Sequence, residues 1–168
     1  GRLALRKNMT LHAIALGETN GTAEMLMFRD AHGSSMLDAG YEVAVDRRVN
    51  VPLFRLDDYV QQRGLPAPQV IKIDCQGAEA TILRGGENAL SKAQVLFLET
   101  WLTRGYGPKT PLLSEIIEML AGFGFSLMDF GERFYDDQQR LYSVDAVFYA
   151  ESLLRQIELR KTPTSDLD

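Results

Sequence analysis

A chain of 168 residues that is 45% hydrophobic and 24% charged suits a single domain over residues 1–168 and excludes a disordered tail or a disulfide-stapled miniprotein. Eighteen basic and 23 acidic residues give a net charge of −5 without a basic tract, so nucleic-acid binding is not expected. The lone Cys75 cannot form an internal disulfide, no stretch is long and apolar enough for a membrane span, and residues 1–9 lack the order of a signal peptide. These features indicate a soluble, cytoplasmic chain.

The first part of the chain is predicted to form strands separated by polar turns. Residues 9–16 (MTLHAIAL) are typical of a buried strand, and the turn-forming residues 17–21 follow them. Residues 23–28 are expected to form a hairpin with that first strand. The small and polar residues 29–41 predict a surface loop.

A further strand and a short helix come next. Residues 49–54 are expected to be extended, and Pro52 predicts an edge strand or a strand end because proline cannot donate to a ladder. Residues 56–62 predict a helix, since Asp57 and Asp58 suit the positive end of the helix dipole.

The second half alternates more regularly between strands and helices. Strands are expected at residues 70–74 (VIKID) and 95–100 (VLFLET), and helices at residues 78–84 and 112–121. This alternation is typical of right-handed crossovers, so it predicts an α/β fold with a mostly parallel sheet.

The end of the chain is predicted to differ in topology. Residues 125–130 and 143–150 are expected to be strands, and residues 151–161 a helix. Because the link between the two strands is too short for a crossover helix, this C-terminal pair is expected to be antiparallel.

Two acids stand at the carboxyl ends of predicted neighbouring strands. Asp74 ends VIKID and Glu99 is the penultimate residue of VLFLET, and in open parallel sheets the ligand crevice lies outside these ends. We expect the two carboxylates to share one rim, where burial raises one pKa as a general base requires. The alternative is that each acid caps the segment that follows it. Lys72 lies on the same strand face as Asp74 and predicts a salt bridge.

Other polar and aromatic residues are weaker candidates. Asp129 and Asp145 lie near the ends of the last two strands, where solvated acids are common, and His12 is expected to be a satisfied core histidine. Two histidines and one cysteine give no zinc-site spacing, and no G-x-S-x-G motif supports a serine triad. Trp101 and Tyr106 are expected to pack, with contact to an acceptor molecule as the alternative.

A family resemblance rests on residues 71–79, IKIDCQGAE, which are similar to the central signature of the FkbM-type methyltransferases, I-K-I-D-x-E/Q-G-A/F-E. Around this segment lie an A-L-G turn, the paired Ser34 and Ser35, V-P-x-x-x-L-D-D at residues 51–58, an L-E-T strand end and V-D-A-V-F. The resemblance implies a Rossmann-like class I methyltransferase fold. It also implies that S-adenosylmethionine is used to methylate a hydroxyl of a sugar, a glycan or a polyketide-like acceptor.

The same resemblance implies roles for individual residues. Asp74 is expected beside the methyl donor and the acceptor, and Glu99 is expected to assist as a base or an orienting group. Ala15 and Leu16 are expected to line the adenine side of the cofactor site. Cofactor contacts are therefore expected at Ala15, Leu16 and Asp74, and no metal is expected.

One departure from the family pattern affects these expectations. The sequence opens at Gly1 without methionine and resembles the C-terminal two thirds of the family, without the glycine-rich D-x-G-A-N-x-G turn or the second-strand acid that holds the ribose. It is therefore expected to be N-terminally truncated, so that residues 9–16 lack their normal strand neighbours. We expect these residues alone to bind S-adenosylmethionine weakly and to be inactive.

Two other functions stay open at this point. The missing glycine turn favours a non-catalytic remnant or a binding module. A metal-dependent hydrolase built on Asp74, Glu99 and Asp145 is also compatible with the residue types, because carboxylate oxygens suit Mg²⁺. The sequence identifies neither the acceptor nor the oligomeric state.

Overall fold

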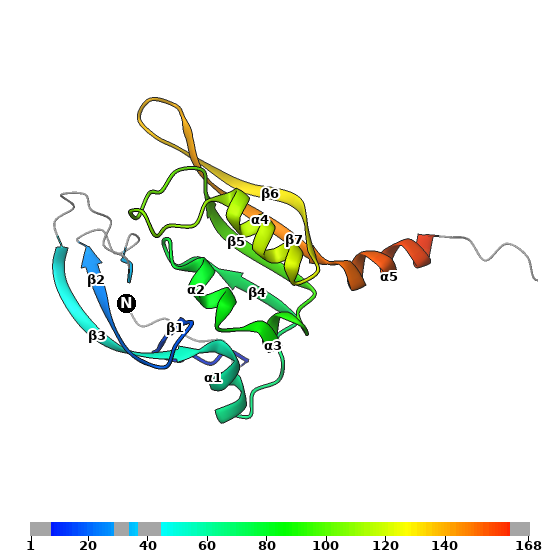
Figure 1. The fold of residues 1–168 in the computed structure, drawn as a ribbon, viewed down its shortest axis with the longest axis horizontal. Helices are drawn as coiled ribbons and strands as arrows, with labels where there is room; N and C mark the ends of the chain where they lie inside the picture. The colour runs from blue at the N-terminus through cyan, green and yellow to red at the C-terminus, as the bar shows by residue number, and fades with distance from the viewer. Residues whose placement is uncertain (1–7, 29–33, 37–44, 162–168) are drawn as a thin grey trace, which may run out of the picture.

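The computed structural model describes residues 8–28, 34–36 and 45–161, which form a mixed α/β structure with two sheets (Figure 1). The predicted surface loop at residues 29–41 lies largely outside the described residues. The strands are β1 (Ala15–Gly17), β2 (Gly21–Phe28), β3 (Val45–Arg55), β4 (Val70–Ile73), β5 (Val95–Trp101), β6 (Phe125–Tyr135) and β7 (Leu141–Ala150). The helices are α1 (Leu56–Gln62), α2 (Glu79–Arg84), α3 (Glu87–Leu90), α4 (Leu113–Gly122) and α5 (Glu151–Lys161).

The larger sheet has the strand order β4-β5-β7-β6. Its β4–β5 pair is parallel, with Ile73 opposite Leu98, which confirms the predicted neighbours. The predicted antiparallel C-terminal pair is also confirmed, but β7 pairs antiparallel with β5 as well as with β6. The sheet is therefore mixed and not mostly parallel. The short link after β6 forces β7 to return antiparallel, and β7 takes the place beside β5 that a crossover strand would have filled.

The smaller sheet has the order β1-β3-β2, so the predicted hairpin between the first two strands is wrong. β3 lies between them, parallel to β1 and antiparallel to β2, with Leu53 opposite both Ala15 and Gly21. The first strand is also much shorter than residues 9–16. Pro52 would be the next partner of β1 in this register, and its missing N–H explains why the ladder stops there.

Pro52 lies in the central strand of this sheet, so of the two predicted alternatives, an edge strand or a strand end, the edge strand is wrong. At its own position, however, β3 pairs with Thr22 of β2 only, because the pairing with β1 begins at Leu53. Proline is therefore tolerated where one side of the strand lacks a partner.

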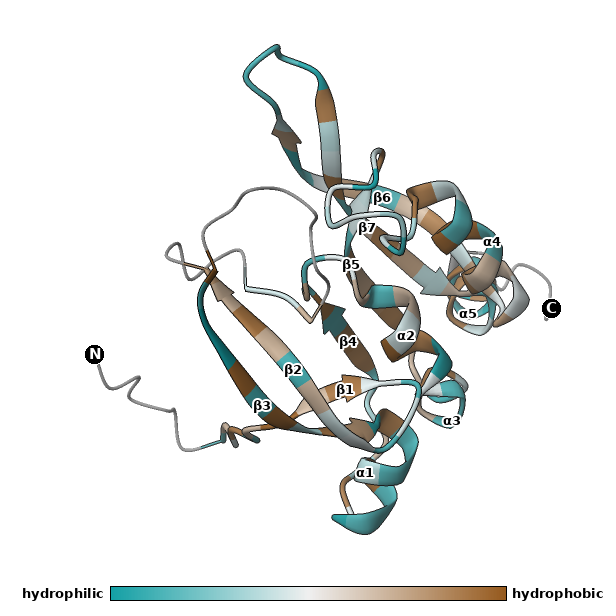
Figure 2. Cartoon of the chain, turned by 60° about the vertical axis from the view of Figure 1, so that its left-hand side comes forward, coloured by the Kyte–Doolittle hydropathy of each residue, from teal (hydrophilic) through white to brown (hydrophobic). Residues whose placement is uncertain are grey.

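The predicted helices are confirmed within one residue, and α3 is an additional short helix that the sequence analysis did not anticipate. Helices α2, α3 and α4 cover one face of the larger sheet, where their apolar residues meet those of β5 and β7 (Figure 1). Phe148, Leu96, Leu98 and Leu120 are fully buried in this core. Hydrophilic residues dominate α1 and the tip of the β6–β7 hairpin (Figure 2). No helix in the described ranges is long and apolar enough to cross a membrane.

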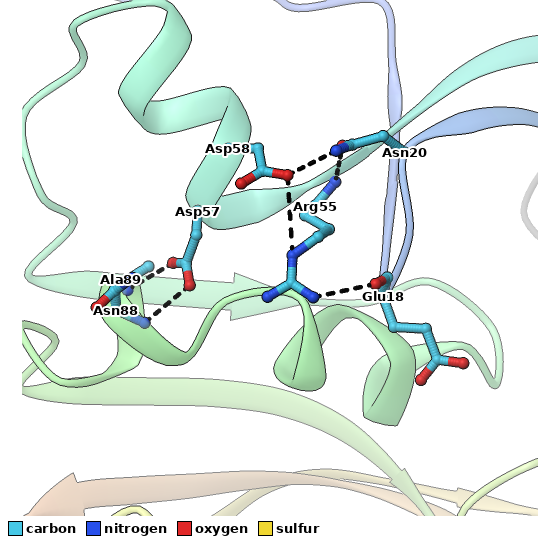
Figure 3. A network of polar contacts seen from close by, with 7 residues as sticks. All are labelled: Glu18, Asn20, Arg55, Asp57, Asp58, Asn88 and Ala89. Atoms are coloured by element: carbon cyan, nitrogen blue, oxygen red, sulfur yellow. Dashed lines mark hydrogen bonds and ion pairs between the residues drawn. The ribbon is translucent and has the colours of Figure 1, made fainter.

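A polar network connects the small sheet to α1 and α3 (Figure 3). The Asp57 carboxylate accepts the backbone N–H groups of Asn88 and Ala89, each at 2.9 Å, and so caps the start of α3. The Asn20 amide donates to Asp58 at 2.6 Å and accepts the Arg55 N–H at 2.9 Å. The two acids therefore stabilise contacts between elements, in addition to their favourable place in the first turn of α1.

The small sheet meets α2 at a very close backbone contact. A Cβ atom on Gly85 would lie only 1.9 Å from the carbonyl oxygen of Gly17. The Gly85 carbonyl in turn accepts the Asp57 N–H at 3.0 Å. The absence of a side chain at Gly85 is therefore what allows β1 to lie against the end of α2.

Candidate functional site

Three carboxylates lie in a row across neighbouring strands of the larger sheet. Asp74 follows Ile73, which is opposite Leu98, so Asp74 comes beside Glu99. Glu99 is directly opposite Asp145 on β7. Because side chains alternate along a strand and Leu98 faces the core, the row lies on the sheet face away from that core. The structure therefore brings Asp74 and Glu99 to one rim and adds Asp145 to them.

Glu99 is the buried member of this row. It is 8% exposed, and its Oε2 atom has no hydrogen-bond partner among the described residues. Burial, followed by the negative charges of Asp74, Glu79 and Asp145, raises the pKa of Glu99 to about 8. Glu99 is therefore mostly protonated at neutral pH, where it can donate a hydrogen bond.

Lys72 forms the predicted salt bridge with Asp74, at 2.9 Å between Nζ and Oδ2. Both side chains are partly exposed, at 58% and 43%, and the ammonium also lies 5.7 Å from the centre of the Phe97 ring. The hydrogen bond and charge of Asp74 raise the pKa of Lys72. Burial raises the pKa of Asp145, and the charge of Lys72 opposes that shift. Lys72 is thus the cation that balances the acidic row.

The buried Glu99 makes stability depend on pH. The folded-state pKa is about 8 and the unfolded value about 4.5, so folding favours the protonated form. The contribution of Glu99 to the free energy of unfolding is therefore fully present below about pH 4.5, and it falls as the pH rises towards 8. We expect Glu99→Gln, which cannot ionise, to make the unfolding free energy less dependent on pH across this window. Urea denaturation at several pH values measures the effect. The same change of unfolding free energy with pH in both proteins would contradict it.

The loop between β4 and α2 holds Asp74 in a specific backbone conformation. Gln76 has φ of 59° and Gly77 has φ of 99°, so two consecutive residues are in the left-handed region. Fully buried Glu79 clamps the loop: its Oε1 accepts the Gly77 N–H at 3.0 Å, and the Cys75 N–H and thiol at 3.4 Å. Burial raises the pKa of Glu79. The sequence analysis gave Glu79 no role, although an acid in the first turn of a helix just after a strand end is a signal for such a cap.

Gln76 contacts three other segments of the site. Its Oε1 accepts the Tyr106 hydroxyl at 2.6 Å, and its Nε2 donates to Asp74 Oδ1 at 3.4 Å. Its carbonyl accepts the Ser35 hydroxyl at 2.8 Å. The sequence analysis gave Gln76 no role either, although Gln76 occupies the E/Q position of the signature in residues 71–79; its positive φ cannot be read from the sequence.

The aromatic residues after β5 have different surroundings. Trp101 is 4% exposed and lies beneath Gly105, where a Cβ atom would approach its ring to 2.7 Å, so the expected packing role is confirmed. The Tyr106 ring packs edge-on against Trp101 at 5.2 Å. Its hydroxyl reaches Gln76 at the rim, so Tyr106 has both a packing contact and a polar contact at the site.

A cavity of about 550 Å³ lies between the two sheets, beside this rim. Ala15 and Leu16 of the small sheet and Asp74 of the larger one all line it, together with Ser34 and Ser35. The size and the largely apolar lining are typical of a pocket for a small organic ligand. The three predicted cofactor residues therefore lie around one cavity, whereas Glu99 does not line it.

The remaining sequence candidates lie in other arrangements. Asp129 is exposed, and its carboxylate accepts the N–H of the next residue at 2.8 Å. His12 precedes β1 instead of lying in a core strand, and its Nδ1 lies 2.8 Å from the Tyr59 hydroxyl. In the parts of the chain that the structure describes, no group of His, Cys, Asp and Glu side chains is arranged to hold a metal ion. The metal-dependent hydrolase therefore gains no support from this geometry.

The chain is similar to named methyltransferases over nearly half of its length. It is 32% identical over 81 residues to the 2-O-methyltransferase NoeI of Sinorhizobium fredii, which covers 48% of this chain and 33% of NoeI. It is 31% identical over 77 residues to the hexuronic acid methyltransferase AglP of Haloferax volcanii, which covers 45% of this chain and 31% of AglP. The matched parts thus span about a third of each relative. No solved structure matches the chain.

The family pattern extends further than either of these pairwise alignments. Residues 3–127 match the methyltransferase FkbM domain, which includes the small sheet, the cavity and the loop that holds Asp74. This match confirms the resemblance first seen in residues 71–79. The chain belongs to the FkbM methyltransferase family.

Proposed function

We propose that this protein is an S-adenosylmethionine-dependent O-methyltransferase that acts on a hydroxyl of a sugar, a glycan or a polyketide-like acceptor. The observation that carries the proposal is the cavity lined by Ala15, Leu16 and Asp74, which opens beside the rim with Glu99. One relative is named as a 2-O-methyltransferase and another as a hexuronic acid methyltransferase, which supports transfer to oxygen and a sugar acceptor.

We also propose that residues 1–168 belong to one Rossmann-like class I methyltransferase domain. The parallel β4–β5 pair is joined through α2 and α3. Such a strand–helix–strand unit is the building block of Rossmann-like folds, which supports this arrangement.

The cavity residues fit the methyl donor in size and chemistry. Ala15 and Leu16 offer an apolar wall for the adenine ring, and Asp74 lies at the end nearer the carboxylate row. When bound, S-adenosylmethionine supplies an electrophilic methyl group. The protein must then align an acceptor hydroxyl with that group and remove the hydroxyl proton.

Asp74 and Glu99 have complementary roles in this proposal. Asp74, paired with Lys72, accepts the proton that the acceptor hydroxyl gives up. Glu99 is protonated at neutral pH and orients the acceptor or Asp74 as a hydrogen-bond donor. The different surroundings of the two carboxylates therefore separate the base from the donor.

A turnover assay of the full-length gene product tests this function. The protein is incubated with S-adenosylmethionine and a panel of hexoses, hexuronic acids and short oligosaccharides, and S-adenosylhomocysteine and methylated product are detected by mass spectrometry. We expect methylation of at least one acceptor, unchanged by EDTA. Donor binding without transfer to any acceptor would favour a binding module, and loss of activity with EDTA would favour a metal-dependent enzyme.

A further inference from the structure

We propose that Gln76 is a positioning residue that fixes the Asp74 carboxylate relative to the Tyr106 hydroxyl, so that the acceptor meets both groups in one geometry. This inference rests on the proposed methyl transfer at Asp74. It concerns a residue to which neither the sequence analysis nor the family resemblance gives a role.

The backbone of Gln76 is held in a conformation that glutamine rarely adopts. Its φ of 59° lies in the left-handed region, which is unfavourable for residues other than glycine. The Glu79 clamp on Gly77 and Cys75, and the Ser35 hydroxyl on the Gln76 carbonyl, maintain this conformation. Residues in such conformations concentrate at functional sites, where the surroundings over-determine them.

The two ends of the Gln76 amide match their partners. The carbonyl oxygen accepts the Tyr106 hydroxyl at 2.6 Å, and the NH₂ group donates to Asp74 Oδ1 at 3.4 Å. Lys72 donates to the other oxygen of Asp74, Oδ2, at 2.9 Å. Each carboxylate oxygen thus has its own donor, which fixes the rotation of the group that accepts the acceptor proton.

The Tyr106 side of this link is itself firmly held. The Arg104 guanidinium forms a bidentate pair with Glu115 at 3.1 and 2.6 Å and donates to the Thr110 carbonyl at 2.6 Å. The Tyr106 N–H donates to the Thr110 hydroxyl at 2.9 Å. These contacts hold the loop after β5 in place, and with it the Tyr106 hydroxyl. The Gln76 side chain, which contacts both Tyr106 and Asp74, therefore links the position of Asp74 to that of the loop.

Gln76→Gly is the informative variant because glycine adopts the required φ without strain and keeps the carbonyl that Ser35 contacts. In the full-length protein, assayed with the best acceptor of the sugar panel, we expect kcat to fall by about 10- to 100-fold, the scale of a lost alignment. The melting temperature and the KM for S-adenosylmethionine are expected to stay unchanged. Tyr106→Phe keeps the ring on Trp101 and should lower kcat similarly. The double variant should lower kcat little more than the more damaging single substitution does.

Gln139→Gly is the matched control, because Gln139 also has φ of 59° but lies exposed in the β6–β7 turn. It should leave kcat unchanged. Wild-type kcat in Gln76→Gly, or a loss that only follows a lowered melting temperature, would overturn the positioning role. A normal rate in Asp74→Asn would instead overturn the proposed function itself.

A second readout does not need turnover. Trp101 is the only tryptophan in the sequence, and the Tyr106 ring packs against it. We expect Gln76→Gly and Tyr106→Phe to change the Trp101 emission spectrum of the 168-residue chain, whereas Gln139→Gly should not. An unchanged spectrum in Gln76→Gly would mean that Gln76 does not hold Tyr106.

Discussion

Asp74→Asn is expected to lower kcat of the full-length enzyme by about 10²-fold or more, the usual span of general-base effects. Asparagine keeps the size of the side chain and some of its hydrogen bonding, but it cannot accept the acceptor proton. The Lys72 ion pair is half-exposed, so its loss should have little effect on folding. Steady-state kinetics with saturating S-adenosylmethionine, together with a thermal melt, measures both effects.

The partner substitution shows whether the two acids act together. Glu99→Gln keeps a hydrogen-bond donor at the position where Glu99 is protonated at neutral pH, so its effect on kcat should be smaller than that of Asp74→Asn. Because groups that act as a unit lose activity non-additively, the double variant should cost little more than Asp74→Asn alone. Near-wild-type rates in Asp74→Asn would show that the acid at this strand end is structural.

Gly85→Ala is expected to destabilise the fold by about 3 kcal/mol, at the upper end of the usual cost of overpacking. The added Cβ would lie 1.9 Å from the Gly17 carbonyl oxygen, and neither atom belongs to a side chain that can rotate away. The small sheet must therefore move away from α2, which also widens the cavity between Leu16 and Asp74. Urea denaturation of both proteins under the same conditions measures the loss.

Gly122→Ala provides the control for this effect. Gly122 ends α4, and no atom lies within 4 Å of a Cβ built there. Alanine at this position is expected to be neutral or to stabilise by about 0.5–1 kcal/mol, because it reduces the freedom of the unfolded chain. If both variants lost the same stability, the close contact at Gly85 would not be the cause.

The elements that could be predicted from sequence are those whose patterns are local. The apolar spacing of α4 and the run VIKID gave the correct element types, and the parallel β4–β5 pair followed from chain order. The pairing of β3 with both β1 and β2 could not be predicted in this way. It depends on contacts such as Asn20 with Arg55, which join residues far apart in the chain.

For the candidate site too, only the residues identified by a local pattern could be predicted from sequence. Strand-end position was enough to identify Asp74 and Glu99 as neighbours, because parallel strands bring their carboxyl ends together. Gln76 and Glu79 lie in the same short segment, but their roles depend on backbone angles and burial. Such properties arise only after the helices pack on the sheet. Asp145 joined the row because β7, and not a parallel strand, lies next to β5.

The position of β4 at the border of its sheet has a consequence for solution behaviour. Among the described residues β4 pairs with β5 alone, so the outer N–H and C=O groups of a strand with the sequence VIKI have no strand partner. Such an edge can template the addition of another chain, and Val70, which is 64% exposed, adds apolar surface there. Lys72 places a positive charge in the middle of this edge, which disfavours intermolecular strand pairing. Lys72 is therefore the charged residue of an otherwise apolar edge strand, in addition to its ion pair with Asp74.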